Sequence, residues 1–217
     1  MPTKTFNNLT ERKRNKIIEA SLKEFSLNKY NSASINNIVK NAGVSKGSMY
    51  QYFDNKKDLY LYLLEVASDK KLNYISENVN TSKLKMFELI KEIHLIGAKF
   101  DLKNPKYSML IINALNETTN EELNNINKKL KEKSDKFFDQ YIVEGQNKNL
   151  IRNDLNHKLI SFLISRLSIV LIDYVAEKYD FTYLDLIKKG ENKLPLPEKD
   201  LEDILEQFIS VFLEGFK

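Results

Sequence analysis

Apolar side chains recur at helical spacing along almost the whole chain, and short polar or glycine-containing stretches separate the periodic segments. After Thr10, which can cap a first helix, Ile18, Leu22 and Phe25 fall at positions i, i+4 and i+7. Only 6 Gly and 4 Pro interrupt the 217 residues, so helix breakers are few. The pattern predicts an all-α fold.

Two short helices joined by a glycine turn are expected between residues 34 and 53. Ser34 can cap the first, and Ser45 can cap the second. Gly43 lies between them, where a left-handed backbone conformation would reverse the chain. The first helix has apolar residues at i, i+3, i+4 and i+7, namely Ile35, Ile38, Val39 and Ala42. This order is typical of a helix-turn-helix, whose second helix enters the DNA major groove.

Longer helices are expected in the rest of the chain. Asp54 can cap a helix that runs into the seventies and ends before the polar stretch 77–82. Five further periodic segments follow, at about 83–100, 104–116, 119–146, 153–179 and 197–216.

The segment 153–179 has apolar residues around most of its circumference, and the last helix is also more apolar than one buried face requires. Within the segment 153–179 the apolar stretch 159–175 is short for a membrane span, and it contains Arg166 and Asp173. We therefore expect a buried helix and no membrane partner. One core cannot cover such a helix completely. A second copy of the chain is the simplest cover, which predicts a homodimer.

The net charge of +4 is unevenly distributed. Residues 1–57 carry 11 Lys or Arg and 4 Asp or Glu, an excess of +7, whereas residues 58–217 carry 23 and 26, an excess of −3. A polyanion, a membrane surface or a solvated face would each fit this charge. We expect a domain of residues 1–57 and a second of residues 58–217, joined by a helix that starts near residue 54.

Several classes of chemistry are excluded by residues that the sequence lacks. Without Cys there are no disulfides, thiolate metal sites or Cys nucleophiles, and nothing indicates an oxidising compartment. Residues 1–16 do not have the order of a signal peptide, so a cytoplasmic location is expected. The sequence has no G-x-S-x-G, phosphate-binding glycine loop or H-E-x-x-H, and His94 and His157 do not form a metal pattern. We therefore expect neither an enzyme nor a bound cofactor or metal.

The second short helix has side chains suited to a surface held against phosphates. It offers hydroxyl groups, a cation and a glycine that permits close approach, contributed by Ser45, Lys46, Gly47, Ser48, Tyr50 and Tyr52. Met49 and Phe53 can pack inward. The amide of Gln51 can pair with adenine through two hydrogen bonds, which makes Gln51 the best candidate for reading a base.

From Ile17 to Leu64 the sequence resembles the N-terminal domain of the TetR family of bacterial transcriptional regulators. The similarity lies in I-I-E-A-S-L-K-E-F, in A-G-V-S-K-G-S-M-Y-Q-Y-F and in the following D-N-K-K-D-L. Ser48 stands where Thr is usual, Val39 where Ala is often found and Gln51 where His is frequent. The resemblance covers about a quarter of the chain and implies an N-terminal three-helix DNA-binding domain followed by a helical bundle for ligand binding and dimerisation.

Carried over by position, the resemblance implies two groups of DNA contacts. Those to the backbone are Ser34, Ser45, Ser48, Tyr50, Tyr52 and Lys56, and those nearest base edges are Lys46 and Gln51. Taken singly, each of Tyr50 and Tyr52 would more often pack in the protein, and Lys56 would more often be solvated. The basic cluster Arg12, Lys13, Arg14 and Lys16 fits either a DNA-contacting arm or a solvated start.

The resemblance also implies a small-molecule effector bound by the C-terminal helices. Polar groups on otherwise apolar helical faces are the candidates to line its site, namely His94, Tyr107, Asn113, Tyr141, Arg166 and Asp173. The alternative for each is a satisfied polar group of the core or of an interface. Arg166 and Asp173, seven residues apart, could form an ion pair with each other or pair across a dimer.

Together these observations predict a dimeric, effector-responsive regulator that binds palindromic double-stranded operator DNA, with repression as the expected mode and activation as the open alternative. The remaining alternative is a helical protein-interaction module that does not bind DNA.

Overall fold

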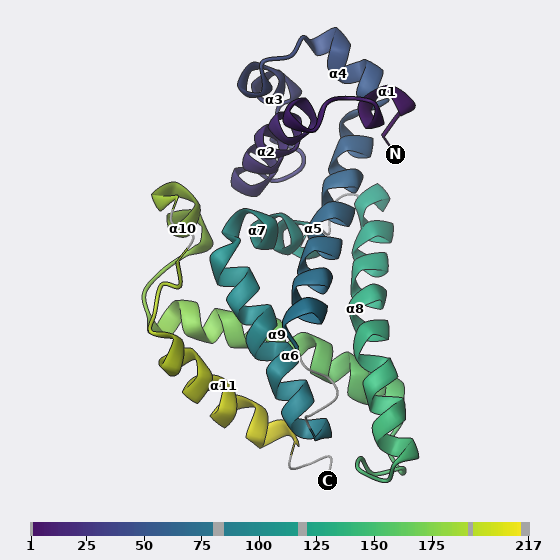
Figure 1. Cartoon of the computed structure of the whole chain (residues 1–217), viewed down its shortest axis with the longest axis vertical. Coiled ribbons are helices and arrows are strands. Elements are labelled where there is room, and N and C mark those ends of the chain that lie inside the picture. Colours follow the sequence, from purple (N-terminus) through teal and green to yellow (C-terminus); the bar gives the residue numbers. More distant parts are fainter. Residues whose placement is uncertain (1, 80–84, 117–120, 191–192, 214–217) are drawn as a thin grey trace. The chain divides into compact units, whose positions relative to one another are not determined.

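The computed structural model describes residues 2–79, 85–116, 121–190 and 193–213, and every regular element within these ranges is an α-helix (Figure 1). This confirms the predicted all-α fold. The helices are α1 (Lys4–Asn7), α2 (Glu11–Leu27), α3 (Ile35–Ala42), α4 (Lys46–Tyr52), α5 (Lys56–Asn78), α6 (Met86–Lys103), α7 (Pro105–Asn116), α8 (Glu121–Asn147), α9 (His157–Lys178), α10 (Tyr183–Lys189) and α11 (Glu198–Leu213). The predicted boundaries at residues 83, 119 and 216 lie outside the described residues.

The chain forms two compact units, and the helix α5 contributes to both. Unit 1 consists of Met1–Lys70 and Pro105–Asn127, and unit 2 consists of Lys71–Asn104 and Lys128–Lys217. The expected boundary between residues 57 and 58 therefore falls in the first turn of α5.

Unit 1 is organised around α2, which contacts both α3 and α7. Ile17, Leu22 and Phe25 are buried, whereas Ile18 is half-buried. Because two helices cover α2, its buried face is wider than the i, i+4, i+7 pattern alone indicates. Ile38 of α3 and Met49 of α4 complete this part of the core.

The predicted ends of the helix-turn-helix are confirmed. The hydroxyl of Ser34 accepts a hydrogen bond from the backbone N–H of Asn37, and the hydroxyl of Ser45 accepts one from the N–H of Ser48. Gly43 ends α3 with φ of 69°, in the left-handed region that only glycine enters without steric cost.

The other two predicted caps have different outcomes. Thr10 is the N-cap residue of α2, as predicted, although its side chain makes no capping hydrogen bond. At the start of α5 the cap is Asn55 and not Asp54, since the Asn55 side-chain oxygen accepts from the N–H of Asp58 at 2.9 Å. Phe53 still donates its N–H to the carbonyl of Met49 as the C-cap of α4, and α5 begins at Lys56.

Two short helices were not predicted. One is α1, which contains a single buried residue, Phe6. The other is α10, which begins with a capping box of Thr182 and Asp185 and ends at Gly190 with φ of 67°. The sequence contains all three signals for α10, so its existence was predictable from local chemistry.

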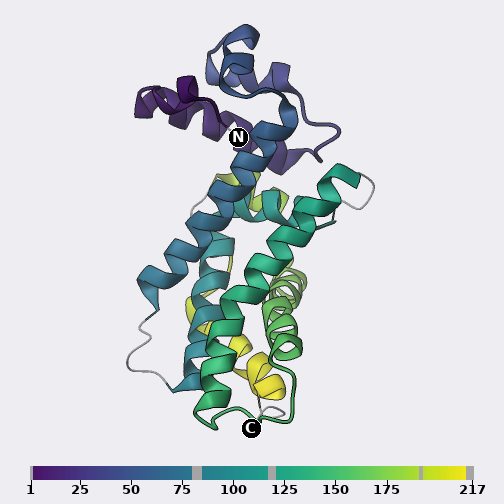
Figure 2. The same ribbon diagram turned by 90° about the vertical axis from the view of Figure 1, so that its right-hand side faces the viewer.

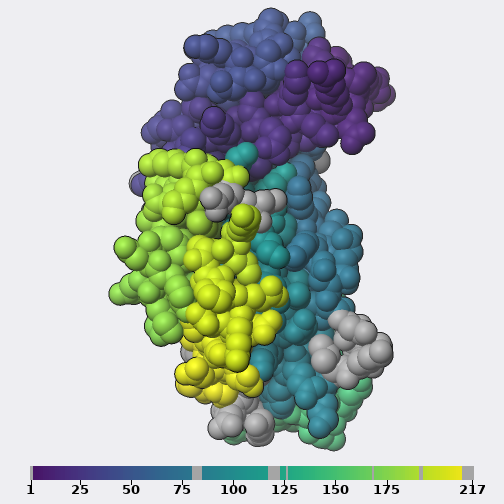
Figure 3. Space-filling model, turned by 60° about the vertical axis from the view of Figure 1, so that its left-hand side comes forward, coloured from purple at the N-terminus to yellow at the C-terminus, as the bar shows by residue number. Residues whose placement is uncertain are grey.

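Unit 2 is built on contacts of α6 with α9 and α11, and α11 lies on its surface (Figure 3, yellow). Lys99 of α6 forms ion pairs with Glu198 at 2.5 Å and Glu202 at 3.3 Å, which hold the first turns of α11. The helices α8 and α9 lie side by side and are joined by side-chain hydrogen bonds (Figure 2).

The helix α9 has two apolar faces, as its sequence predicts. The inner face is buried in the core of unit 2 and consists of Ile160, Ile164, Leu167, Leu171 and Val175. The outer face is exposed and consists of Leu159, Phe162, Leu163, Ile169, Val170 and Tyr174. By length and composition α9 is the one helix in the described ranges that could cross a membrane, but a core helix meets the same two criteria.

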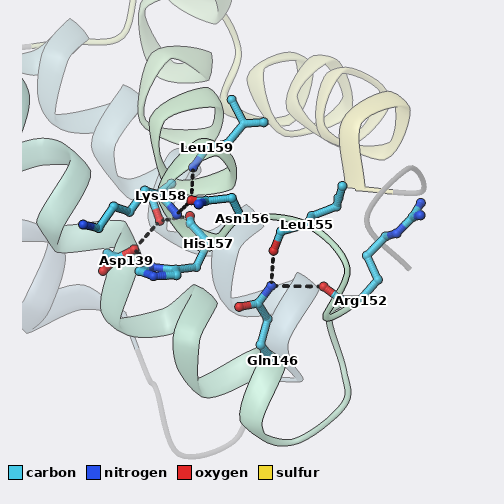
Figure 4. Close-up of polar contacts among 9 residues, drawn as sticks. Asp139, Gln146, Arg152, Leu155, Asn156, His157, Lys158 and Leu159 are labelled. Atoms are coloured by element: carbon cyan, nitrogen blue, oxygen red, sulfur yellow. Dashed lines mark hydrogen bonds and ion pairs between the residues drawn. The ribbon is translucent and has the colours of Figure 1, made fainter.

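Polar contacts fix the connection between α8 and α9 (Figure 4). The side-chain amide of Gln146 donates to the carbonyls of Arg152 and Leu155 at 3.0 and 2.9 Å. Asn156 then caps α9 by accepting from two backbone N–H groups, and the His157 ring meets the Asp139 carboxylate at 2.7 Å. The start of α9, and with it the direction of its outer face, is thereby set.

The left-handed turn predicts a specific cost for adding a side chain. Replacing Gly43 by Ala should lower the free energy of unfolding by about 1–2 kcal/mol, because the added Cβ is strained at positive φ. Gly47→Ala is the control, since Gly47 has a helical backbone within α4 and an added Cβ there meets only the Ser45 hydroxyl, at 3.9 Å. Urea denaturation should show no loss for the control. Equal losses would contradict the role of the turn.

Candidate nucleic-acid interface

The short helix α4 has an inner and an outer face. Met49 and Tyr52 are buried, as is Phe53 at its C-cap. On the opposite side Lys46 and Gln51 are exposed, and Tyr50 is 48% exposed. Gly47 lies on the outer side between them and adds no side chain, so a ligand can approach the backbone closely. The outer face therefore presents the ammonium of Lys46, the phenol of Tyr50 and the amide of Gln51 to solvent.

The N-terminal end of α4 carries the two predicted serines. The hydroxyl oxygens of Ser45 and Ser48 lie 2.8 Å apart and share a hydrogen bond. Ser45 also accepts from the backbone N–H of Ser48 at 3.0 Å. The serines therefore hold the first turn of the helix, and Ser45 itself is exposed beside Lys46.

Tyr52 lies on the other side of the helix from the exposed face. Only 4% of it is exposed, and its ring centroid is 6.0 Å from that of Phe6. The ammonium of Lys13 lies 5.8 Å from the centroid of the same ring. The structure thus places Tyr52 among aromatic and cationic neighbours rather than with Tyr50 and Gln51.

Lys56 holds the loop between α2 and α3. Its ammonium donates to the carbonyls of Tyr30 at 2.8 Å, Asn31 at 3.3 Å and Ala33 at 3.1 Å, and it lies 4.6 Å from the centroid of the Tyr30 ring. An ammonium has three N–H donors, so these carbonyls use all of them. The loop leads directly into α3, and Lys56 therefore fixes where the helix-turn-helix begins.

A carboxylate holds the end of the same loop. Glu24 of α2 is only 8% exposed, and one of its oxygens accepts from the backbone N–H of Ser34 at 2.9 Å and from the Asn37 side chain at 3.4 Å. A buried carboxylate needs such donors. Glu24 holds the start of α3, a role that was not predicted, although an acidic residue beside Phe25 on the buried face of α2 is a signal that could have identified it.

The four residues of the basic cluster all lie within α2, and not in an arm before it as one reading of the sequence expected. Arg12, Lys13 and Lys16 are exposed, whereas Arg14 is half-buried and donates to the carbonyl of Asn7 at 3.2 Å. Three of the four cations are thus exposed to solvent, and one of them, Lys13, lies beside the Tyr52 ring of α4.

The six candidates for an effector site are divided between the two units. Tyr107 and Asn113 belong to α7 in unit 1. Asn113 donates to the carbonyls of Phe25 and Ser26 at 3.2 and 3.5 Å. Lys70 lies 4.6 Å from the centroid of the Tyr107 ring. Within unit 1 these two polar side chains hold neighbouring elements together.

His94 connects two helices of unit 2. It is 1% exposed, and its two ring nitrogens lie 2.8 Å from the carbonyl oxygen of Ile90 and 3.0 Å from that of Ile164. Its ring also stacks on Phe138, with the centroids 5.1 Å apart. Complete burial lowers the pKa of His94 below its usual value. A neutral ring has a single N–H, so His94 donates to only one of these two carbonyls. Its burial between two helices fits the core histidine that was the alternative to a ligand contact.

Arg166 forms an ion pair with a residue of α8, and not with Asp173 of its own helix as considered from the sequence. Its guanidinium meets the carboxylate of Asp135 on α8 at 2.9 Å and lies 4.7 Å from the centroid of the Phe162 ring. Asp173 is exposed, and Tyr141 is half-buried with its ring edge-on to Phe137. Because spacing along one helix says nothing about neighbouring helices, the sequence did not identify the partner of Arg166.

Comparison with known proteins agrees with this geometry. Residues 17–63 match the family model for bacterial regulatory proteins of the tetR family. The chain is 24% identical over 159 residues to the negative transcriptional regulator IcaR of the icaADBC biofilm operon in Staphylococcus aureus, covering 70% of this chain and 81% of that protein. A TetR family transcriptional regulator of Chloroflexus aurantiacus has a similar crystal structure, with a TM-score of 0.77, 29% identity and coverage of 99% of this chain and 98% of that one.

A further structural neighbour is the transcriptional regulator FadR of Bacillus subtilis, which was crystallised with stearoyl-CoA. Its TM-score is 0.68 at 19% identity, and the match covers 90% of this chain and 97% of that one. At this identity the likeness concerns the fold. All three similar proteins are transcriptional regulators.

The contacts of Lys56 predict a structural effect that is independent of any ligand. Replacing Lys56 by Met removes the donor to three loop carbonyls and should lower the free energy of unfolding by about 1–3 kcal/mol. The control is Lys29→Met, which removes an exposed cation from the same loop and should change stability by less than about 0.5 kcal/mol. Urea denaturation of both variants checks this. If both were as stable as the wild type, the three hydrogen bonds would have no role in the fold.

Proposed function

This chain belongs to the TetR family of bacterial regulatory proteins, and we propose that it is a transcriptional repressor that binds operator DNA as a homodimer and responds to a small-molecule effector. We assign DNA binding to residues 1–57 and effector binding and dimerisation to residues 58–217. The similarity to a negative regulator supports repression rather than activation.

The exposed face of α4 is the observation that carries DNA binding. In this proposal Ser45, Ser48 and Tyr50 contact phosphates, Lys46 lies nearest base edges, and Gln51 reads an adenine through its amide. The basic excess of +7 in residues 1–57 supports this assignment, because phosphate neutralisation provides much of the affinity for DNA. The backbone contacts predicted for Ser34, Tyr52 and Lys56 stay predictions, since each of these residues already has partners within unit 1.

A second copy of the chain fits the outer face of α9. Its six exposed apolar or aromatic residues extend over the length of the helix, and Val170 and Leu159 are each 53% exposed. Such a contiguous apolar surface is costly in water and is typical of a protein interface. When two identical helices pack through the same face, the contact is symmetric and closes as a dimer, which suits a palindromic operator.

The effector is proposed to act on unit 2. Stearoyl-CoA in the structure of the similar FadR supports a small molecule as effector. The contacts proposed from the sequence, His94, Tyr107, Asn113, Tyr141, Arg166 and Asp173, stay predictions. An effector can control DNA binding only if it binds one quaternary state of the dimer more tightly than the other.

DNA binding is tested by gel-shift titration with a duplex from the region upstream of the gene for this chain. We expect affinity to fall steeply with salt. Replacing Tyr50 by Ala should weaken binding to all duplexes to a similar degree, whereas Gln51→Ala should remove about 1–3 kcal/mol of preference at one base pair. Unchanged preference in Gln51→Ala would show that this residue does not read a base.

The same titration separates the proposal from the alternative function. A helical interaction module would dimerise normally and bind no duplex at any salt concentration. The proteins similar to this chain do not favour that alternative.

Dimerisation predicts that a charge on the outer face of α9 will separate the subunits. Phe162→Glu should give a monomer in sedimentation at micromolar concentration and should weaken operator binding, because two linked half-site contacts become independent. Leu150→Glu is the matched control, as Leu150 is 48% exposed and Phe162 is 47% exposed, but Leu150 lies in the connection before α9. A dimer that persists in Phe162→Glu would exclude this face as the interface.

A further inference from the structure

The C-terminal end of α4 is held by the first residues of the chain. A helix leaves its last carbonyl groups without partners inside the helix. Thr3 provides partners for two of them, as its hydroxyl donates to the carbonyl of Gln51 at 2.7 Å and its backbone N–H donates to that of Tyr52 at 3.0 Å. The residue proposed to read a base is thus bonded through its own main chain to Thr3.

An aromatic cluster anchors the same segment. Phe6 is 0% exposed, and its ring centroid lies 4.8 Å from that of Phe53, 5.4 Å from that of Tyr62 and 6.0 Å from that of Tyr52. Phe53 follows α4 directly and Tyr62 lies on α5. Phe6 therefore fills the space between the end of α4 and the first turns of α5, and Figure 1 shows α1 beside that end of α4.

The segment itself depends on these contacts. A helix of four residues such as α1 is too short to be stable alone in water. The Thr3 hydroxyl caps α1 at its N-terminus by accepting a hydrogen bond from the N–H of Phe6 at 3.4 Å. Arg14 links α1 to α2 by donating a hydrogen bond to the carbonyl of Asn7. Thr3 and Phe6 thus order both α1 and the end of α4.

We propose that residues 2–9, which we call the N-terminal clasp, position α4 for reading base pairs, with Thr3 and Phe6 as positioning residues for sequence-specific DNA binding. The inference rests on the function proposed above. Releasing the clasp would let the last turn of α4, and with it Gln51, adopt several positions, and ordering it again on the operator would cost free energy. Binding to an unrelated sequence needs only phosphate contacts, so it would be affected little.

A pair of threonines in the clasp allows a matched test. Thr3→Val keeps the size of the side chain and removes the hydroxyl, and Thr5→Val makes the same change at an exposed position of α1. The probes are a duplex selected from a random-sequence pool by the wild-type protein, variants of it with single base-pair changes, and an unrelated duplex. Circular dichroism and urea denaturation establish that each variant is folded at the temperature of the assay.

Thr3→Val should bind the selected duplex about three- to tenfold more weakly than the wild type, the size expected for one hydrogen bond. Its affinity for the unrelated duplex and its salt dependence should be unchanged, and Thr5→Val should behave as wild type. Phe6→Ala should lose more, and Phe6→Leu, which retains much of the buried volume, should recover part of that loss.

Two results would overturn the proposal. In the first, Thr3→Val binds the selected duplex as tightly as wild type and discriminates as well against the base-pair changes. In the second, it loses affinity for both duplexes equally and its salt dependence becomes shallower, which would indicate a direct phosphate contact. If the wild type selects no duplex at all, the proposed function itself is wrong, and this outcome is distinct from the other two.

Discussion

Helix α4 has seven residues, and a helix of this length does not persist in water without support from its surroundings. The rest of unit 1 supplies that support on three sides. The Ser45 hydroxyl caps the first turn, and the buried Met49 side chain anchors the inner face. Thr3 donates hydrogen bonds to two carbonyls at the C-terminal end of the helix. The exposed residues of the outer face, Lys46, Tyr50 and Gln51, are not needed for packing and can contact a ligand while the helix stays folded.

The helix α3, which precedes α4 in the sequence, is also held by specific hydrogen bonds. The Glu24 carboxylate accepts a hydrogen bond from a backbone N–H at the start of α3. The Lys56 ammonium donates hydrogen bonds to three carbonyls of the loop before α3. A carboxylate that binds donors and an ammonium that binds acceptors together fix one short loop. The charged residues of unit 1 therefore have two roles, since some are exposed and increase its positive field while others set its geometry.

Features that depend on neighbouring residues in the sequence were predictable. The caps Ser34 and Ser45 and the turn at Gly43 follow from chemistry within four residues, and the two apolar faces of α9 follow from its period. Contacts between distant parts of the chain were not predictable. The partner of Arg166 lies 31 residues away and that of Thr3 lies 48 residues away. For the same reason the sequence revealed the exposed candidates for DNA binding but not the residues that hold them.

In unit 2 the polar contacts lead to α9. His94 joins it to α6, and Arg166 and His157 join it to α8, while its outer face is the surface proposed for the second subunit. Burial alone would raise the pKa of Asp139, but hydrogen bonds from His157 and Ser161 lower it, so this carboxylate stays charged and keeps its contact with the start of α9. A displacement of α6 or α8 by an effector would therefore act directly on the helix proposed to form the dimer.

If two copies of α4 read a palindromic sequence, hydroxyl-radical footprinting of the dimer on its upstream duplex should reveal both half-sites. We expect two symmetric protected regions on one side of the duplex, with centres one helical turn of about 10 base pairs apart, or a multiple of it. One half-site without a symmetric partner, or protection that does not depend on the sequence, would contradict it.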